Sequence, residues 1–311
     1  MALVRSFRKF ALLTTFLVYL VIFAGGLVRV SGAGLGCPDW PKCFGRWIPP
    51  TSVEQLPPDM HPAQFNITLA WIEYINRLVG VIVGIMIATV AIWALVKFRN
   101  NKRILLASIG AAILVAFQGW HGGVVVESLL KQSLVSIHYL LALLVAGMMI
   151  FVSVQSHYLE ADEIQIPVAP KDIRWWAWLL LLLGFVQIFL GTQVRSTVEN
   201  LASDFPLLSG SERLAKVGLL NHVHLALGLT VAAFSWVFSF WVRRNRQAIT
   251  PLIKKGAVIA VILALVQLLL GFGFILLGLS PLVELFHLCV ASLIIGTLFM
   301  ILSATFGQKE K

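Results

Sequence analysis

The segments Ser133-Leu134-Val135-Ser136-Ile137-His138 and Leu282-Val283-Glu284-Leu285-Phe286-His287 each open a long apolar run that has a histidine near its start. The two histidines are 149 residues apart (287 minus 138). Gln118 and Gln267 recur at the same offset, and Gly25-Gly26-Leu27-Val28-Arg29 resembles Gly191-Thr192-Gln193-Val194-Arg195. Self-similarity at a fixed offset indicates that the second half of the chain is a copy of the first.

Apolar runs of membrane-spanning length recur along the whole chain. Hydrophobic residues make up 59% of the 311 residues and charged residues 12%, whereas about a quarter of a soluble domain is charged. A helix needs about 20 apolar residues to cross a bilayer, and eight such runs lie near residues 10–30, 69–96, 104–126, 134–157, 175–195, 217–242, 256–278 and 282–305. The sequence therefore predicts an all-α integral membrane protein with eight transmembrane helices, arranged as two tandem four-helix bundles.

The duplication divides the chain into three predicted parts. Residues 1–157 are expected to form an N-terminal four-helix half whose long outer loop carries two cysteines. Residues 175–311 form the C-terminal four-helix half, in which we expect the corresponding outer loop at residues 196–216. Residues 158–174 contain acidic side chains and two prolines, and they are expected to link the halves on the cytoplasmic side.

Basic residues set the predicted orientation. The net charge is +10, and with the N-terminus inside, most of the 24 Lys and Arg residues fall at cytoplasmic helix ends. This distribution follows the positive-inside rule, so the charge does not indicate a nucleic-acid partner. We expect a multi-pass protein of the cell membrane, in contact with lipid, with both termini cytoplasmic.

Cys37 and Cys43 lie in the first outer loop, which faces an oxidising compartment in this orientation. A disulfide is favoured over a metal site, because no second pair of ligands lies nearby in the sequence. Cys289 lies in the last apolar run and is expected to be a small packing residue.

Histidine is rare inside membrane helices and costly there unless it has a partner. Neutral imidazole is a standard axial ligand of haem iron, so His138 and His287 at equivalent positions suggest paired haem sites. In the second half, His222 and His224 are about 200° apart around one helix, and only one of them can face the bundle interior. Aligning the two halves places His224 opposite Asn76, which favours His224 over His222.

The first half carries different polar residues. Glu73, Asn76 and Arg77 share one helical face at spacings of three and four. Glu73 and Arg77 form either an internal ion pair or a polar wall beside a cofactor, in which Glu73 handles protons. Asn76 cannot bond iron strongly, so His138 is the one clear ligand. His121 belongs to no repeated pattern; it either replaces the missing ligand, binds a haem propionate, or faces a neighbouring helix.

Two arginines lie at equivalent positions in the halves. Arg29 and Arg195 are expected at the outer ends of the first and fifth helices. They are either contacts for haem propionates or interfacial side chains that reach toward water.

The stretch Gly34-Leu35-Gly36-Cys37-Pro38-Asp39-Trp40-Pro41-Lys42-Cys43-Phe44-Gly45 resembles the cysteine loop of the haem A synthase family. Together with residues 73–77 and 118–126 and the histidines above, the resemblance covers essentially the whole chain. It implies a membrane oxidoreductase of cytochrome oxidase assembly, which converts haem O to haem A by oxidising a porphyrin methyl group to a formyl group.

The same resemblance implies roles for individual residues. His224 and His287 would ligate a haem B in the second half, and His138 would be an axial ligand of the substrate haem O in the first half. Glu73 would be catalytic, and the Cys37–Cys43 disulfide would be redox-sensitive.

The chain departs from the family pattern at one position. The pattern reads Glu-x-x-His-Arg where this chain has Asn76, so the substrate iron would be five-coordinate through His138, or would take His121 or water. The implied partners are haem O and the haem O synthase that supplies it, and a homo-oligomer is left open.

The alternative is a di-haem b-type electron-transfer cytochrome without haem-modifying activity. A transporter would need charged groups at mid-membrane, whereas the polar residues here lie near one surface.

Overall fold

The computed structural model describes residues 2–58, 60, 62, 65–160, 171–245 and 249–306. In these ranges the regular elements are all helices: α1 (Ala2–Val30), η1 (Ala33–Leu35), η2 (Val53–Gln55), α2 (Ile67–Lys97), α3 (Lys102–Glu127), α4 (Gln132–Glu160), α5 (Lys171–Asp204), α6 (Gly210–Lys216), α7 (Leu219–Arg244), α8 (Pro251–Leu276) and α9 (Pro281–Ala304). Eight of these helices are long and apolar enough to cross a membrane. The chain is an all-α membrane protein, as predicted, and residues 161–170 of the predicted linker lie outside the described ranges.

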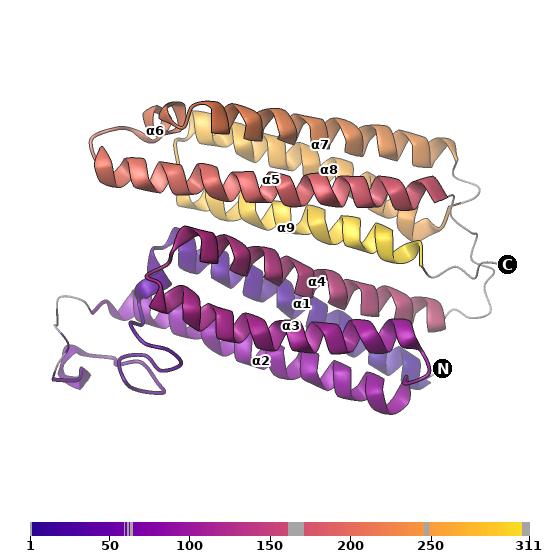
Figure 1. Cartoon of the computed structure of the whole chain (residues 1–311), viewed down its shortest axis with the longest axis horizontal. Coiled ribbons are helices and arrows are strands. Elements are labelled where there is room, and N and C mark those ends of the chain that lie inside the picture. The colour runs from indigo at the N-terminus through magenta and orange to yellow at the C-terminus, as the bar shows by residue number, and fades with distance from the viewer. Residues whose placement is uncertain are drawn as a thin grey trace. The chain divides into compact units, whose positions relative to one another are not determined.

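The first compact unit spans Phe10–Met149 and contains most of α1, α2, α3 and most of α4, which run alongside one another (Figure 1). Helix α2 packs against α3. Three further contacts close the four helices into a ring: Phe10–Trp93 joins α1 to α2, His121–His138 joins α3 to α4, and Arg29–Gln132 joins α1 to α4.

The second compact unit consists of residues 150–311 together with residues 1–9. Helix α5 packs against α7 and α9, and α8 packs against the same two helices, so these four helices also close into a ring. Glu160 at the end of α4 binds the start of α1, because Arg5 Nε lies 2.8 Å from Glu160 Oε1 and Arg8 Nη1 lies 2.9 Å from Glu160 Oε2.

Helix α5 is longer than the sequence predicted. The segment expected to begin the second outer loop at residue 196 continues as helix to Asp204. Arg195 pairs with Glu199 one turn later (Nη2 to Oε1, 3.2 Å), and the Thr197 hydroxyl donates to the Gln193 carbonyl (3.0 Å). The rule that ends a helix at the membrane boundary was wrong here, because these polar side chains satisfy one another along the helix.

The short helix α6 also lies within the predicted loop. It begins with a capping box, in which the Ser209 side chain accepts from the Glu212 N–H and the Glu212 carboxylate accepts from the Ser209 N–H. The Ser209 hydroxyl also donates to the Glu212 carboxylate (2.7 Å), and this hydrogen bond, followed by the one from the Ser209 N–H (2.7 Å), lowers the pKa of Glu212 below its usual value.

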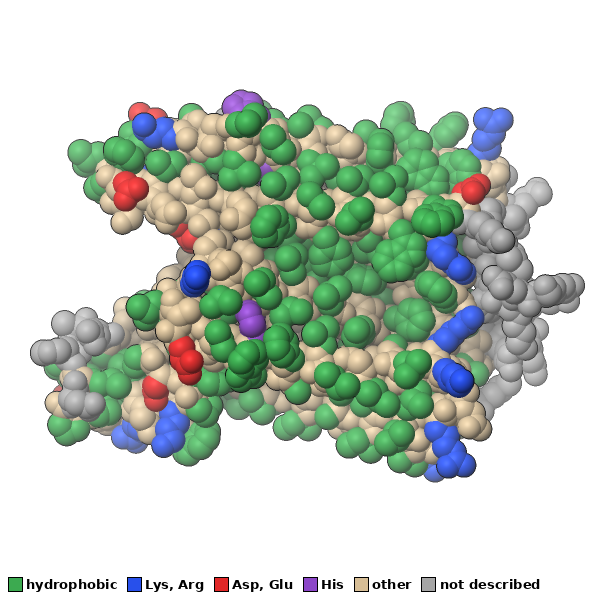
Figure 2. Space-filling model, viewed as in Figure 1, with side chains coloured by type: hydrophobic (Ala, Val, Ile, Leu, Met, Phe, Trp, Pro, Cys, Tyr) green, Lys and Arg blue, Asp and Glu red, His purple; other side chains and the backbone are tan. Residues whose placement is uncertain are grey.

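The polarity of the surface side chains changes along the helices. On the face drawn in Figure 2, apolar side chains cover the middle of the helices, and charged side chains lie toward their ends. Large apolar residues such as Phe16, Ile85 and Leu269 are exposed on the helix sides. Exposed apolar side chains of this kind suit a lipid environment, because lipid tails are as apolar as the side chains themselves.

Candidate functional site

The Cys loop, defined here as residues 34–45, is closed by the predicted disulfide between Cys37 and Cys43, which is confirmed. Both cysteines are buried, and they pack with Phe44 and with Ala70 of α2. At Gly36 the loop backbone approaches α2 so closely that a Cβ atom would lie 2.4 Å from the Leu69 carbonyl oxygen. A glycine is therefore required at this position for the loop to lie on α2.

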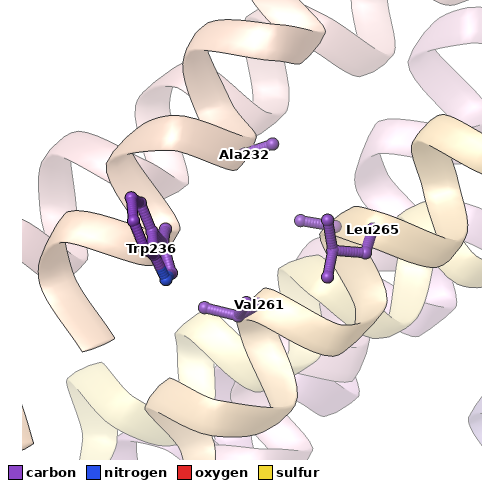
Figure 3. A pocket seen from close by; sticks show the side chains of 5 residues that line it. Ala232, Trp236, Val261 and Leu265 are labelled. Carbon is purple, nitrogen blue, oxygen red and sulfur yellow. The ribbon is translucent and has the colours of Figure 1, made fainter. Parts of the chain in front are cut away.

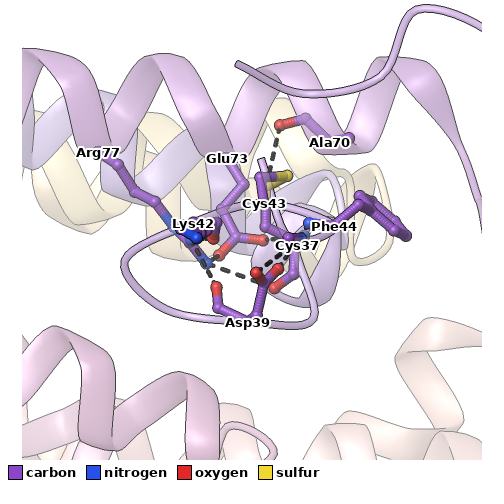
Figure 4. The surroundings of a disulfide bond; sticks show 9 residues. Cys37, Asp39, Lys42, Cys43, Phe44, Ala70, Glu73 and Arg77 are labelled. Carbon is purple, nitrogen blue, oxygen red and sulfur yellow. Dashed lines mark hydrogen bonds and ion pairs between the residues drawn. A yellow bond between two sulfur atoms is a disulfide. The ribbon is translucent and has the colours of Figure 1, made fainter. Parts of the chain in front are cut away.

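Glu73 and Arg77 of α2 hold the Cys loop through its backbone (Figure 4). Glu73 Oε2 accepts a hydrogen bond from the Cys37 N–H (2.8 Å), and Glu73 Oε1 pairs with the Arg77 guanidinium. Arg77 also donates to three loop carbonyls, those of Asp39 (2.8 Å), Lys42 (2.8 Å) and Cys37 (3.3 Å). The ion pair that was one interpretation of these residues is present, and it also anchors the loop.

Trp40 extends this anchor to α3. The Arg77 guanidinium lies 4.8 Å from the centre of the Trp40 ring, a cation–π distance. A Cβ atom on Gly123 of α3 would lie 2.5 Å from Trp40 Cδ1. In the sequence, Trp40 stands out only as a tryptophan inside the cysteine motif, and Gly123 only as a member of residues 118–126.

His138 lies at the contact between α3 and α4. Its backbone carbonyl accepts a hydrogen bond from Gln118 Nε2 (2.7 Å), and its Nδ1 lies 3.4 Å from Nδ1 of the buried His121. A Cβ atom on Gly122 would lie 3.4 Å from His138 Cε1. His121 thus contacts the neighbouring helix α4, which is one of the three interpretations of this residue.

His224 and His287 are held in similar ways in the second unit. The His224 carbonyl accepts from Gln187 Nε2 of α5 (2.9 Å), and a Cβ atom on Gly191 would lie 3.0 Å from His224 Cε1. Likewise, a Cβ atom on Gly271 would lie 3.6 Å from His287 Cε1. Gln187 was missed by the sequence analysis, although a glutamine four residues before Gly191 in an apolar helix was a usable signal.

His222 faces away from this arrangement. Its side chain is exposed, and its Nδ1 lies 2.9 Å from the Gly218 carbonyl of its own helix. His224 is partly buried against α5. The geometry agrees with the expectation that only one of the two histidines can face the interior of the unit.

The contacts between glycine and polar side chains follow the sequence duplication. Gly122–His138 and Gly271–His287 are related by 149 residues in both members. The aligned counterpart of Gly191–His224 is a contact of Gly25 with Asn76, whose Oδ1 lies 3.9 Å from the Gly25 Cβ position. One side of the first unit therefore presents an amide where the second unit presents an imidazole.

Several buried polar atoms on these helices have no hydrogen-bond partner in the described part of the chain. They are Asn76 Oδ1, Gln118 Oε1, Gln187 Oε1, His224 Nδ1, Gln267 Oε1 and His287 Nδ1. Unpaired polar groups inside a membrane protein are costly, and such groups beside glycines suit a polar or metal-bearing ligand. The described residues hold no group of three or more His, Cys, Asp or Glu side chains that could bind a metal ion. Two imidazoles suffice for haem, because the porphyrin supplies the other ligands.

Arg29 and Arg195 each contact the helix that carries a candidate histidine. Arg29 Nη2 donates to Gln132 Oε1 of α4 (3.1 Å), and Arg195 Nε lies 2.7 Å from Glu284 Oε1 of α9, one turn before His287. Arg29 lies at the end of α1 as expected, whereas Arg195 lies well inside α5 because that helix continues to Asp204.

An apolar crevice of about 180 Å³ lies between α7 and α8, lined by Ala232, Trp236, Val261, Ala264 and Leu265 (Figure 3). None of its lining side chains is titratable. We therefore place the candidate chemistry at the histidines and the Cys loop and not in this crevice.

Comparison with known proteins identifies the family of this chain. A sequence model of the cytochrome oxidase assembly protein family (COX15-CtaA) matches residues 8–299. The chain belongs to this family. Its relatives include the Heme A synthase of Alkalihalophilus pseudofirmus, 25% identical with 94% of this chain and 95% of the relative covered. The Heme A synthase of Geobacillus kaustophilus is 24% identical (96% and 91% covered), and that of Bartonella tribocorum is 27% identical (81% and 78% covered).

Proposed function

We propose that this protein is a haem A synthase, a membrane oxidoreductase that oxidises a methyl group of haem O to a formyl group and so supplies haem A for terminal oxidases. The observation that carries the proposal is its full-length similarity to relatives that are themselves named Heme A synthase. The duplicated glycine–histidine contacts support it, because they leave space beside imidazoles at equivalent places in both units.

The second unit is proposed to hold a resident haem B between His224 and His287. Each imidazole lies against a glycine of a neighbouring helix, His224 against Gly191 of α5 and His287 against Gly271 of α8. Gln187 fixes the backbone at His224, and Gly191 leaves room beside its ring. When bound, haem B supplies electron transfer. Arg195 is the proposed contact for a propionate, since its guanidinium is already directed at the start of α9.

The first unit is proposed to bind the substrate, haem O, with His138 as axial ligand. Asn76 would be a weak ligand, so the substrate haem would be held by His138 without a strong partner at the place of His224 in the second unit. Closed bis-histidine coordination suits electron transfer, whereas an open position suits chemistry. Arg29 is the proposed propionate contact, by its equivalence to Arg195.

Glu73 is proposed to handle protons beside the substrate, with Arg77 holding its carboxylate in place. Because Glu73 also accepts the Cys37 N–H, its position depends on the Cys loop. A redox-sensitive Cys37–Cys43 disulfide would thereby act on the same carboxylate. Reduction would loosen the loop and release the hydrogen bond from the Cys37 N–H to Glu73.

The proposed setting is the cell membrane, with both termini cytoplasmic. Haem O reaches the protein from haem O synthase through the membrane, and the apolar helix surfaces accommodate a substrate of this kind. A homo-oligomer is compatible with these surfaces.

The function is tested by expressing the protein in cells that make haem O and by separating the extracted haems. Haem A, or its hydroxylated precursor, beside haem B is the expected result. Haem B alone, with haem O present and unconverted, would instead favour the di-haem electron-transfer cytochrome. For the ligands, His224→Ala should remove the low-spin haem B spectrum, and the matched variant His222→Ala should keep it. Glu73→Gln should retain haem B and lose haem A formation.

A further inference from the structure

His121 and His138 form an imidazole pair whose rings point at each other edge to edge. The ring centres are 5.6 Å apart and the planes differ by 12°, while the two Nδ1 atoms are 3.4 Å apart. The difference between these distances is about two ring radii, so the Nδ1 atoms lie on the line that joins the rings. The pair is therefore a nearly coplanar, rather long hydrogen bond and not a face-to-face stack.

A neutral imidazole carries one proton, on either Nδ1 or Nε2. In a hydrogen bond between two Nδ1 atoms, one ring donates and the other accepts. If His138 donates, its proton is on Nδ1 and its Nε2 lone pair is free for iron. His121 then accepts through Nδ1 and carries its own proton on Nε2. This is the arrangement in which ligating histidines are usually found, with the second ring nitrogen donating to a partner.

The second unit lacks this partner in the part of the chain that the structure describes. The residue equivalent to His121, by the same offset of 149, is Leu270. His287 Nδ1 is buried without a hydrogen-bond partner, and the His287 ring instead meets the Phe274 ring edge to face at 5.3 Å. The two equivalent histidines thus differ in what supports the nitrogen that does not face iron.

We propose that His121 is a positioning residue for His138: it accepts the His138 Nδ1–H, presents His138 Nε2 to the iron of the haem in the first unit, and does not itself bind that iron. This inference rests on the proposed function for the identity of the haem, but not on its conversion. A hydrogen bond from the ligand's other nitrogen increases electron donation to iron and lowers the reduction potential. One residue, His121 in the first unit against Leu270 in the second, thereby gives the haems of the two duplicated sites different reduction potentials.

The test compares His121→Leu, which copies the residue at position 270, with His121→Gln, whose side-chain oxygen can still accept the Nδ1–H. Full-length protein is loaded with haem, and the reduction potentials of its two haems are measured by optical titration. The first-unit haem is identified as the component that disappears in His138→Ala. Leu270→Val, at the equivalent position of the second unit, is the control for packing. Nitrogen-15 NMR of labelled histidine in the haem-free protein reports the tautomer of His138.

The expected result is a positive shift of the first-unit potential in His121→Leu, a smaller shift in His121→Gln, and an unchanged second-unit potential in both. The wild-type NMR spectrum should show His138 protonated on Nδ1. Equal shifts in both variants, no shift in either, or a His138 proton on Nε2 would overturn the inference. Loss of one axial ligand from the first-unit haem in His121→Leu would show that His121 binds the iron, and it would also overturn it.

Failure of the proposed function gives a different outcome. A wild-type protein that holds haem at His138 and shows these shifts, yet does not convert haem O, would retain the positioning role and refute the enzyme. A wild-type protein whose haem content is unchanged in His138→Ala would overturn the inference, because no iron would be held there.

Discussion

Arg77→Ala should expose the Cys37–Cys43 disulfide to reductant. Arg77 joins α2 to three separate carbonyls of the Cys loop, and it also pairs with Glu73. Its side chain is only 9% exposed and that of Glu73 4%, so solvent screens this pair little. Removing Arg77 leaves the Glu73 carboxylate buried without its cation, beside a loop that has lost three of its hydrogen bonds to α2.

The size of the effect follows from the cost of leaving one member of a buried ion pair behind. Breaking such a pair costs about 3–5 kcal/mol. At about 1.4 kcal/mol for each factor of ten, the equilibrium for opening the Cys loop should rise roughly 140- to 4,000-fold. Both cysteines are buried, so reduction requires opening, and its rate should rise by the same factor while opening and closing remain fast.

The assay is the rate of disulfide reduction in purified full-length protein, followed by labelling of the released thiols with a maleimide. Arg77→Lys keeps the charge but loses the planar fork, and it should fall between wild type and Arg77→Ala. Arg46→Ala is the matched control, because Arg46 lies beside the same loop with an exposed side chain. If Arg77→Ala is reduced as slowly as Arg46→Ala, the loop is not held by Arg77 and the reasoning is refuted.

Three further predictions concern single contacts. Gly36→Ala should accelerate the same reduction, because its Cβ would meet the Leu69 carbonyl at 2.4 Å and overpacking costs about 1–3 kcal/mol. Gly191→Ala should weaken haem binding in the second unit about 5- to 150-fold by titration, because its Cβ meets His224 Cε1 at 3.0 Å, at the same cost. The pKa of Glu212 is lowered in the folded protein, so its contribution to α6 is present at neutral pH and is lost as the pH falls through that lowered value. A spin label on α6 should report this loosening, and Glu212→Ala should show it at neutral pH.

Controls for these predictions come from the same chain. Gly80→Ala and Gly84→Ala in α2 would meet nothing within 4 Å, and alanine favours a helix over glycine by about 1 kcal/mol, so neither should lose stability. Wild-type haem affinity in Gly191→Ala would show that His224 adjusts at no cost. A mobility of α6 that does not change with pH would show that the Glu212 capping contact does not hold the helix.

The helices of the membrane region were predictable because the signal for each of them lies in one continuous stretch of sequence. Length and continuous apolarity are enough to place α2, α3, α4 and α9 to within a few residues of the predicted runs. The duplication was equally readable, since equal spacing of His138 and His287 needs no structure. The rule was wrong at α5, where polar residues beyond Arg195 pair within the helix and extend it to Asp204.

The eight membrane-spanning helices, the closeness of the two cysteines and the residue types available for chemistry could be read from the sequence, because each depends on composition or on separation along the chain. That Arg77 holds carbonyls of Asp39 and Lys42, 38 and 35 residues away, could be seen only in the folded chain, since backbone oxygens carry no sequence signal. The tertiary structure also decided that His121 meets His138 and that His222 turns away from α5. The physical reason is that the direction of a side chain around its helix is set by which neighbouring helix the apolar surface packs against.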